Sequence, residues 1–214
     1  MKIHAEALLF DNDGTLISSM ESVYRCWTRL AQEYGVTEAM ASVDLHGRPA
    51  AEILAEVLPV DKVPEAVSRI ERLEVEDVPG GVVLLPGTKE LLQPLPAHRW
   101  AVVTSATRPL AAARLHEVGI DFPVMIAAND ITRGKPDPEP FLLAAERLGV
   151  DPARCVVFED APAGLASGRA AGMRTVALTT THRADQLTAD VVVPDLSAVS
   201  VQVTGDGLEI TAGA

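Results

Sequence analysis

Short apolar runs recur along the chain, and each is followed by a polar stretch. Residues 5–10 form the first run, which ends at Asp11. Such runs are typical of buried strands, and the others are 100–103, 124–127, 155–158, 175–178 and 191–193. Helical patterns lie between them, over 107–118, 138–148 and 163–171. This alternation predicts βαβ units and a parallel sheet.

One segment interrupts the alternation. From about residue 18 to residue 78, apolar residues recur at helical spacing and no convincing strand is present. Pro79-Gly80-Gly81 and Pro86-Gly87 mark the return to the strand pattern. We therefore predict a helical insertion over residues 17–83, within an α/β core made of residues 1–16 and 84–214.

The last part of the chain, from Val199 to Thr211, alternates apolar and polar residues around Gly205-Asp206-Gly207. This pattern predicts a terminal hairpin, to which the sequence assigns no role.

The net charge of the chain makes some classes of binding partner unfavourable. The formal net charge is -12, so the mean field repels nucleic acid and anionic membrane surfaces. The two cysteines, Cys26 and Cys155, lie in apolar segments without metal-ligand spacing and are expected as buried free thiols. The N-terminal run resembles neither a signal peptide nor a membrane span, which favours a cytoplasmic protein.

Four polar clusters begin where apolar strands end, and in a parallel sheet such loops meet in one crevice. The first contains Asp11 and Asp13, followed by Gly14, which allows a tight turn. One aspartate can act as a nucleophile and the other as a general acid and base. The alternative is a polar turn in which an Asp or Thr caps a helix.

The second cluster, Thr104 and Ser105, opens a helix and suits either phosphate binding or capping. In the third, Lys135 stands in a stiff Gly-Lys-Pro segment, where its ammonium can neutralise a phosphoryl group or is simply solvated. The fourth, Glu159 and Asp160, offers the oxygen ligands that Mg²⁺ prefers, with helix capping by Asp160 as the alternative. The occurrence of all four clusters, in this order, favours a single site.

This combination resembles the haloacid dehalogenase superfamily over nearly the whole chain. The resemblance implies a doubly wound, Rossmann-like α/β core with a helical cap after the first strand. It implies a phosphatase that works through an aspartyl phosphate, with Asp11 as nucleophile and Asp13 as acid and base. It also implies phosphate ligands and a Mg²⁺ site: the former are Asn12, Thr104, Ser105 and Lys135, and the latter is formed by Asp11, Asp13 through its main-chain carbonyl, Asp160, and Glu159 directly or through a water.

Within the insertion, Leu45-His46-Gly47-Arg48 is similar to the sugar and polyol phosphatases of this superfamily. The similarity implies a small phosphate monoester as substrate, with His46 and Arg48 contacting its leaving group. A structural role for His46 is the alternative. Ser18 and Ser19 depart from the pattern, because many members place an acidic residue there. We expect a monomer or a weak homodimer.

Two rival functions remain. A phosphomutase resembling β-phosphoglucomutase would have the same cap position and the same pair of aspartates. The mutase resemblance would want an arginine three residues after the cap glycine and a lysine late in the cap. Here Ala50 stands three residues after Gly47, and the stretch from Glu71 to Asp77 is mainly acidic, with Arg72 as its only cation. A non-catalytic binding protein would have lost a core residue, and none is missing. Asp13 argues against a dehalogenase.

Overall fold

The computed structural model describes residues 1–213 except residues 44, 46 and 47. Its largest sheet is parallel and has the strand order β6-β5-β2-β7-β8-β9. Its strands are β2 (Ala7–Phe10), β5 (Trp100–Val103), β6 (Met125–Ile126), β7 (Cys155–Glu159), β8 (Arg174–Leu178) and β9 (Val191–Val193). Each expected apolar run contributes a strand to this sheet, and the doubly wound α/β class is confirmed.

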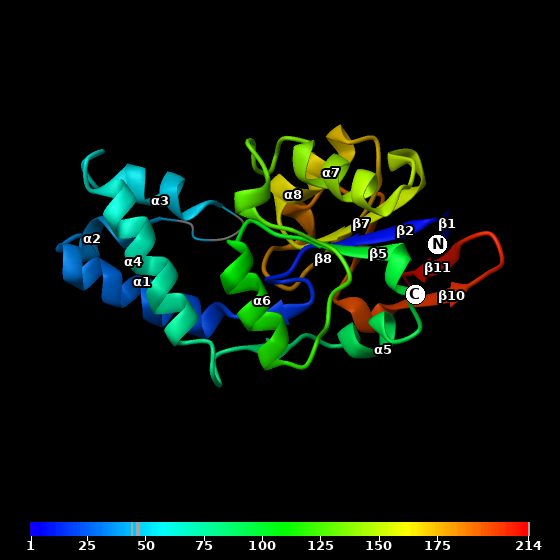
Figure 1. The fold of residues 1–214 in the computed structure, drawn as a ribbon, viewed down its shortest axis with the longest axis horizontal. Coiled ribbons are helices and arrows are strands. Elements are labelled where there is room, and N and C mark those ends of the chain that lie inside the picture. The colour runs from blue at the N-terminus through cyan, green and yellow to red at the C-terminus, as the bar shows by residue number, and fades with distance from the viewer. Residues whose placement is uncertain (44, 46–47, 214) are drawn as a thin grey trace.

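Helices cover both faces of this sheet (Figure 1). On one face, Leu9, Val103 and Val157 pack with Phe141 of α7 (Glu139–Leu148), and α8 (Pro162–Ala170) lies beside α7. On the other face, the alternate residues Leu8, Phe10 and Val102 pack with α5 (Thr88–Leu92) and α6 (Arg108–Glu117). Because successive side chains of a strand point to opposite faces, one short apolar run supplies both halves of the core.

A second, antiparallel sheet joins the two ends of the chain, in the order β1-β11-β10. The hairpin of β10 (Val199–Val203) and β11 (Leu208–Ala212) confirms the predicted terminal hairpin, and β1 (Lys2–Ala5) pairs with β11. The first apolar run is therefore interrupted at Glu6, whose backbone N–H donates to the carbonyl of Arg154 at 2.7 Å. Exposed and buried residues alternate in β1, so its sequence is not a continuous apolar run and it was not predicted as a separate strand.

Four helices follow the first strand of the main sheet and lie to one side of it in Figure 1. They are α1 (Met20–Tyr34), α2 (Thr37–Met40), α3 (Ala50–Val57) and α4 (Val63–Glu76). Their apolar faces form a cluster of their own, which includes Trp27, Leu54 and Ile70. The chain enters through β3 (Ile17–Ser18) and leaves through β4 (Val83–Leu84), and these two strands pair antiparallel.

The connections contain five short 3-10 helices within the described residues: Ala97–Arg99, Ala128–Asp130, Pro152–Arg154, Ala184–Gln186 and Leu196–Ala198. Cys26 and Cys155 are both buried free thiols, as expected. None of the helices in the described part of the chain has the length and apolar character needed to cross a bilayer.

Candidate active site

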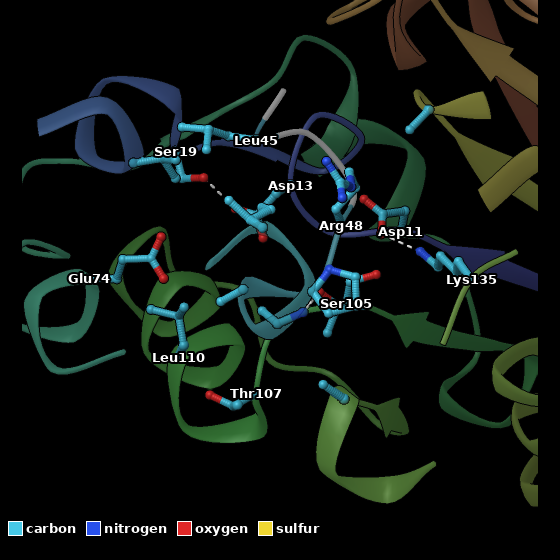
Figure 2. Close-up of a pocket in the computed structure, with 18 of the residues that line it drawn as sticks. Asp11, Asp13, Ser19, Leu45, Arg48, Glu74, Ser105, Thr107, Leu110 and Lys135 are labelled. Atoms are coloured by element: carbon cyan, nitrogen blue, oxygen red, sulfur yellow. Dashed lines mark hydrogen bonds and ion pairs between the residues drawn. The ribbon is translucent and has the colours of Figure 1, made fainter. Parts of the chain in front are cut away.

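The loops at the carboxyl ends of β2, β5 and β7 line one pocket of about 260 Å³, together with residues of α1, α3 and α4. This volume lies near the lower end of the range for small-molecule sites. The residues of all four sequence clusters line this pocket: Asp11, Asp13, Thr104, Ser105, Lys135, Glu159 and Asp160. Figure 2 labels Asp11, Asp13, Ser105 and Lys135 among them.

The first loop turns tightly and points its two aspartates in different directions. The carbonyl of Asn12 accepts the backbone N–H groups of Thr15, Leu16 and Ile17, and Gly14 has a φ of 91° that favours glycine. The Asp11 carboxylate points to Lys135, whereas that of Asp13 does not (Figure 2).

One oxygen of the Asp13 carboxylate is held by two side chains to which the sequence assigned no role at the site. Its Oδ1 accepts a hydrogen bond from Ser19 Oγ at 2.5 Å and another from Arg114 Nη1 at 3.0 Å. Ser19 is buried. Arg114 belongs to α6, and its charge within an amphipathic pattern carried no signal of a buried partner.

Lys135 is buried, and its ammonium joins three elements. Nζ donates to Asp11 Oδ1 at 2.5 Å, to Glu159 Oε1 at 2.6 Å and to the carbonyl of Val103 at 2.9 Å. Burial alone would lower the pKa of Lys135, but the Asp11 and Glu159 carboxylates raise it above its ordinary value. The lysine therefore stays protonated and supplies a fixed positive charge at the end of the pocket.

Three buried carboxylates, Asp11, Glu159 and Asp160, each place one oxygen within 4.8 Å of the others. Burial raises the pKa of Asp11 well above its ordinary value, with further rises from Glu159 and Asp160 against the opposing effect of Lys135. Burial and then the Glu159 carboxylate raise the pKa of Asp160 to about 7. One ammonium cannot balance three carboxylates, so this donor set fits a divalent cation with a preference for oxygen ligands.

Asp160 and Glu159 differ in the kind of donor that their oxygens bind. Both oxygens of Glu159 are used, since Oε1 accepts from Lys135 and Oε2 accepts the backbone N–H groups of Asp160 and Ala161 at 3.0 Å each. Among the described residues, the side-chain donors to Asp160 are two neutral hydroxyls, that of Thr15 at 3.3 Å from Oδ1 and that of Thr181 beside Oδ2, and neutral donors compensate a carboxylate less than an ammonium does. Asp160 is therefore the freer of the two to bind a cation.

Two glycines leave room for these carboxylates. A Cβ atom at Gly14 would lie 2.2 Å from Asp160 Oδ2, and one at Gly164 would lie 1.7 Å from Glu159 Oε1. Gly164 lies in the first turn of α8, so the Glu159 side chain rests directly on the helix backbone. Both positions require glycine because no side chain fits between backbone and carboxylate.

Helix capping was the alternative explanation for several cluster residues, but their side chains do not cap the helices α6 and α8. α6 begins after Thr107 and α8 after Ala161, and neither helix has a side-chain cap. Thr104 Oγ1 instead accepts the backbone N–H of Ala106 at 3.1 Å, and its residue lines the pocket together with Ser105. The polar side chains at these strand ends thus remain directed to the pocket.

Three predicted substrate-binding residues, Asn12, Arg48 and His46, differ in how the structure places them relative to the pocket. Asn12 is fully buried and does not line the pocket; its Nδ2 donates to Asp13 Oδ2 at 3.1 Å, and its Oδ1 is buried without a hydrogen-bond partner. Arg48 lines the pocket and forms an ion pair with Glu56. His46 lies outside the described residues.

Comparisons with known proteins agree with this site. Residues 5–172 match the family model of haloacid dehalogenase-like hydrolases. Hexitol phosphatase A of Escherichia coli is 35% identical over 95% of this chain and 98% of its own. Validoxylamine A 7'-phosphate phosphatase of Streptomyces hygroscopicus subsp. limoneus is 40% identical over 89% and 94%, respectively.

A 2-deoxyglucose-6-phosphate phosphatase of Saccharomyces cerevisiae is 34% identical over 92% of this chain and 90% of its own. Among solved structures, β-phosphoglucomutase from Clostridium difficile has a TM-score of 0.77 and covers 90% of this chain and 92% of that one. At 24% identity, that similarity concerns the fold. The chain belongs to the haloacid dehalogenase-like hydrolase family.

Proposed function

We propose that this protein is a Mg²⁺-dependent phosphatase that hydrolyses small phosphorylated metabolites whose leaving group is a sugar or a polyol. The observation that carries the proposal is the contact between Asp11 and the buried, protonated Lys135 at the end of a small pocket. A carboxylate oriented by an ammonium can attack phosphorus while the same positive charge attracts the phosphoryl oxygens.

In this mechanism Asp11 attacks the phosphorus atom in line with the leaving oxygen and becomes an aspartyl phosphate. Lys135 and the hydroxyl of Thr104 bind the phosphoryl oxygens, with Ser105 beside them. Asp13 protonates the leaving oxygen and then removes a proton from the water that hydrolyses the aspartyl phosphate. Ser19 and Arg114 hold the Asp13 carboxylate for both proton transfers.

Asp11, Asp160 and the main-chain carbonyl of Asp13 would hold Mg²⁺, and Glu159 would orient Lys135 beside it. Mg²⁺ held there would supply positive charge that offsets the negative charge of the phosphoryl oxygens. Without it, the Asp11, Glu159 and Asp160 carboxylates would repel the substrate.

Residues 17–83 form the cap in this proposal, and residues 1–16 and 84–214 form the core. The cap closes over the pocket, excludes bulk water and contacts the leaving group. Arg48 is one of its pocket residues, and His46 is assigned the same role from sequence. The phosphorylated sugars and polyols in the names of the relatives support this leaving-group class. We further propose a cytoplasmic monomer or weak homodimer that binds no nucleic acid.

Phosphate release from a panel of phosphorylated sugars, polyols and nucleotides tests this function. We expect Mg²⁺-dependent release from sugar or polyol monophosphates, and loss of turnover by several orders of magnitude in Asp11→Asn and in Asp13→Asn. Near-normal turnover in folded Asp11→Asn protein, or full activity after exhaustive chelation, would contradict the mechanism.

The similarity of fold to β-phosphoglucomutase makes a phosphomutase the second candidate. Supplying β-glucose 1-phosphate with a trace of glucose 1,6-bisphosphate separates the two. A phosphatase releases inorganic phosphate, whereas a mutase accumulates glucose 6-phosphate without comparable phosphate release.

A further inference from the structure

A buried arginine connects the proton-transfer residue with the helical cap. Arg114 is 4% exposed, and its Nη1 donates to Asp13 Oδ1 at 3.0 Å. On the other side, Nη2 lies 3.5 Å from Oε1 of Glu74, which belongs to cap helix α4. Figure 2 shows Glu74 on the opposite side of the pocket from Lys135. Asp13, which protonates the leaving oxygen in the mechanism proposed above, lies between Lys135 and Glu74 in this view.

Only half of the Glu74 carboxylate is anchored. Its Oε1 accepts a hydrogen bond from Trp27 Nε1 at 3.3 Å and lies near Arg114, whereas Oε2 has no hydrogen-bond partner among the described residues. The residue is 8% exposed and lines the pocket. Within Arg114, Nε and Nη2 are buried without hydrogen bonds. The Glu74 carboxylate thus lines the pocket with one oxygen bonded to protein groups and the other available as a hydrogen-bond acceptor for a ligand.

The walls around Glu74 are mostly apolar, with Val23, Ile53, Val67 and Leu110 on the cap and α6 sides. A few polar groups within such walls fix the orientation of a small ligand. A carboxylate accepts hydrogen bonds from hydroxyl groups and repels a phosphate. Glu71, one turn before Glu74, adds a second negative charge to the same pocket.

We propose that Glu74 is a specificity-determining residue, which accepts hydrogen bonds from the hydroxyls of the leaving group and rejects a second phosphate. Arg114 is a positioning residue that holds the Glu74 carboxylate in place. This inference rests on the phosphatase function proposed above and narrows its substrate class. The substrate carries one phosphate and, at its far end, uncharged hydroxyl groups.

The test compares Glu74→Gln with Glu76→Gln, which makes the same change at an exposed position of α4 outside the pocket. For each variant, kcat/KM is measured on 2-deoxyglucose 6-phosphate, glycerol 1-phosphate and p-nitrophenyl phosphate, which lacks distal hydroxyls. In Glu74→Gln, we expect the ratio of sugar to aryl activity to fall about 10- to 100-fold, as for the loss of a charged hydrogen bond. Glu76→Gln keeps the wild-type ratio.

Inhibition by glucose 1,6-bisphosphate gives a second measurement, in which Glu74→Gln should increase affinity rather than reduce activity. Removing the negative charge of Glu74 should make this compound a tighter inhibitor, by several fold, which a damaged fold cannot do. Arg114→Lys should lower the sugar-to-aryl ratio by a larger factor in the wild-type background than in the Glu74→Gln background, because the part of its effect that passes through Glu74 is then already lost, whereas the part that passes through Asp13 remains.

The outcomes separate this inference from the function on which it rests. If the wild-type protein with Mg²⁺ releases phosphate from none of these compounds, the proposed function is wrong. If the wild-type protein is active and Glu74→Gln loses activity equally on sugar and aryl phosphates, or binds the bisphosphate no more tightly, the function stands and the role of Glu74 is overturned.

Discussion

Lys135 and Glu159 support each other before any substrate binds. Lys135 needs two carboxylates to remain charged while buried, and Glu159 needs the ammonium and two backbone N–H groups to remain buried. This explains why Glu159, although it belongs to the acidic cluster, is better suited to orienting Lys135 than to binding a cation. Asp160→Ala should accordingly weaken Mg²⁺ binding more than Glu159→Ala, as measured by the Mg²⁺ concentration for half-maximal activity.

Gly164→Ala tests how closely Glu159 depends on the helix beneath it. The added methyl group would lie 1.7 Å from Glu159 Oε1, so the carboxylate must move and Lys135 loses one partner. We expect kcat/KM to fall about 100-fold, as for a displacement of about 1 Å in a catalytic site. Gly205→Ala, at a position with open space, serves as the control.

Helix propensity alone predicts that Gly164→Ala increases the stability of the protein, because alanine stabilises a helix interior by about 1 kcal/mol relative to glycine. A Gly164→Ala protein with wild-type activity and increased stability would show that Glu159 can move without consequence.

At this scale, the sequence predicted the residues that follow strands and missed those that lie on helices. Asp11, Thr104 and Asp160 were placed correctly in one pocket because parallel strands bring their carboxyl ends together. Arg114 and Glu74 were missed because their contact depends on how α6 packs against α4, which no local pattern records. Ser19 was noted only as a departure, although it bonds Asp13.

Among the elements, α6 and α4 are the pair whose contact joins the insertion to the core near the site. Buried Arg114 of α6 forms ion pairs with buried Glu74 of α4 and with the half-buried Asp13 in the loop after β2. Burial raises the pKa of Glu74, and the Arg114 guanidinium opposes that rise. A single arginine thus holds two carboxylates, the buried Glu74 on α4 and the half-buried Asp13 in the loop after β2.

Replacing Arg114 with methionine should therefore destabilise the protein, because Asp13 and Glu74 would be left without their cation. Breaking a buried ion pair by removing one partner costs about 3–5 kcal/mol. Urea denaturation followed by circular dichroism measures this change in the free energy of unfolding. Arg72→Met, at an exposed position of α4, should change it by less than about 0.5 kcal/mol.

The double variant Arg114→Met with Glu74→Gln should recover part of the loss, since one buried charge is then removed. A loss in Arg114→Met that is as small as in Arg72→Met would contradict the role given to this arginine.

The elements also differ in how well the sequence predicted them. Strands of the main sheet and the helices α6, α7 and α8 were found within about two residues, because burial on both sides makes the apolar runs distinct. The separate strand β1 was missed, since its pairing with β11 joins the two ends of the chain and leaves Lys2 and His4 exposed. Pairing across such a distance has no local signature.

For the molecule as a whole, the site works against folding stability. Asp11, Glu159 and Asp160 bring negative charge together inside a protein that already has a net charge of -12. Bound Mg²⁺ would relieve this repulsion, so the stability of the protein should depend on pH and Mg²⁺ together.

The sign of this dependence follows from the raised pKa of Asp160, which is about 7 in the folded protein against an ordinary value of 3.8. Between these pH values the folded state binds a proton more tightly than the unfolded state, so stability without Mg²⁺ should fall as pH rises from about 4 to about 7. The raised pKa of Asp11 acts in the same direction. Groups with lowered pKa values, such as Glu33 at about 2, act at lower pH.

Mg²⁺ requires the ionised carboxylates, so its affinity should increase as pH rises through about 7, and saturating Mg²⁺ should reduce or reverse the loss of stability. Thermal unfolding at several pH values, with Mg²⁺ and with a chelator, measures both effects. Asp160→Asn should weaken the pH dependence and the response to Mg²⁺ together, because a neutral amide neither titrates nor repels its neighbours. A melting temperature that is constant between about pH 5 and pH 8 under chelation would show that Asp160 is ionised throughout, and that Lys135 alone balances the acidic cluster.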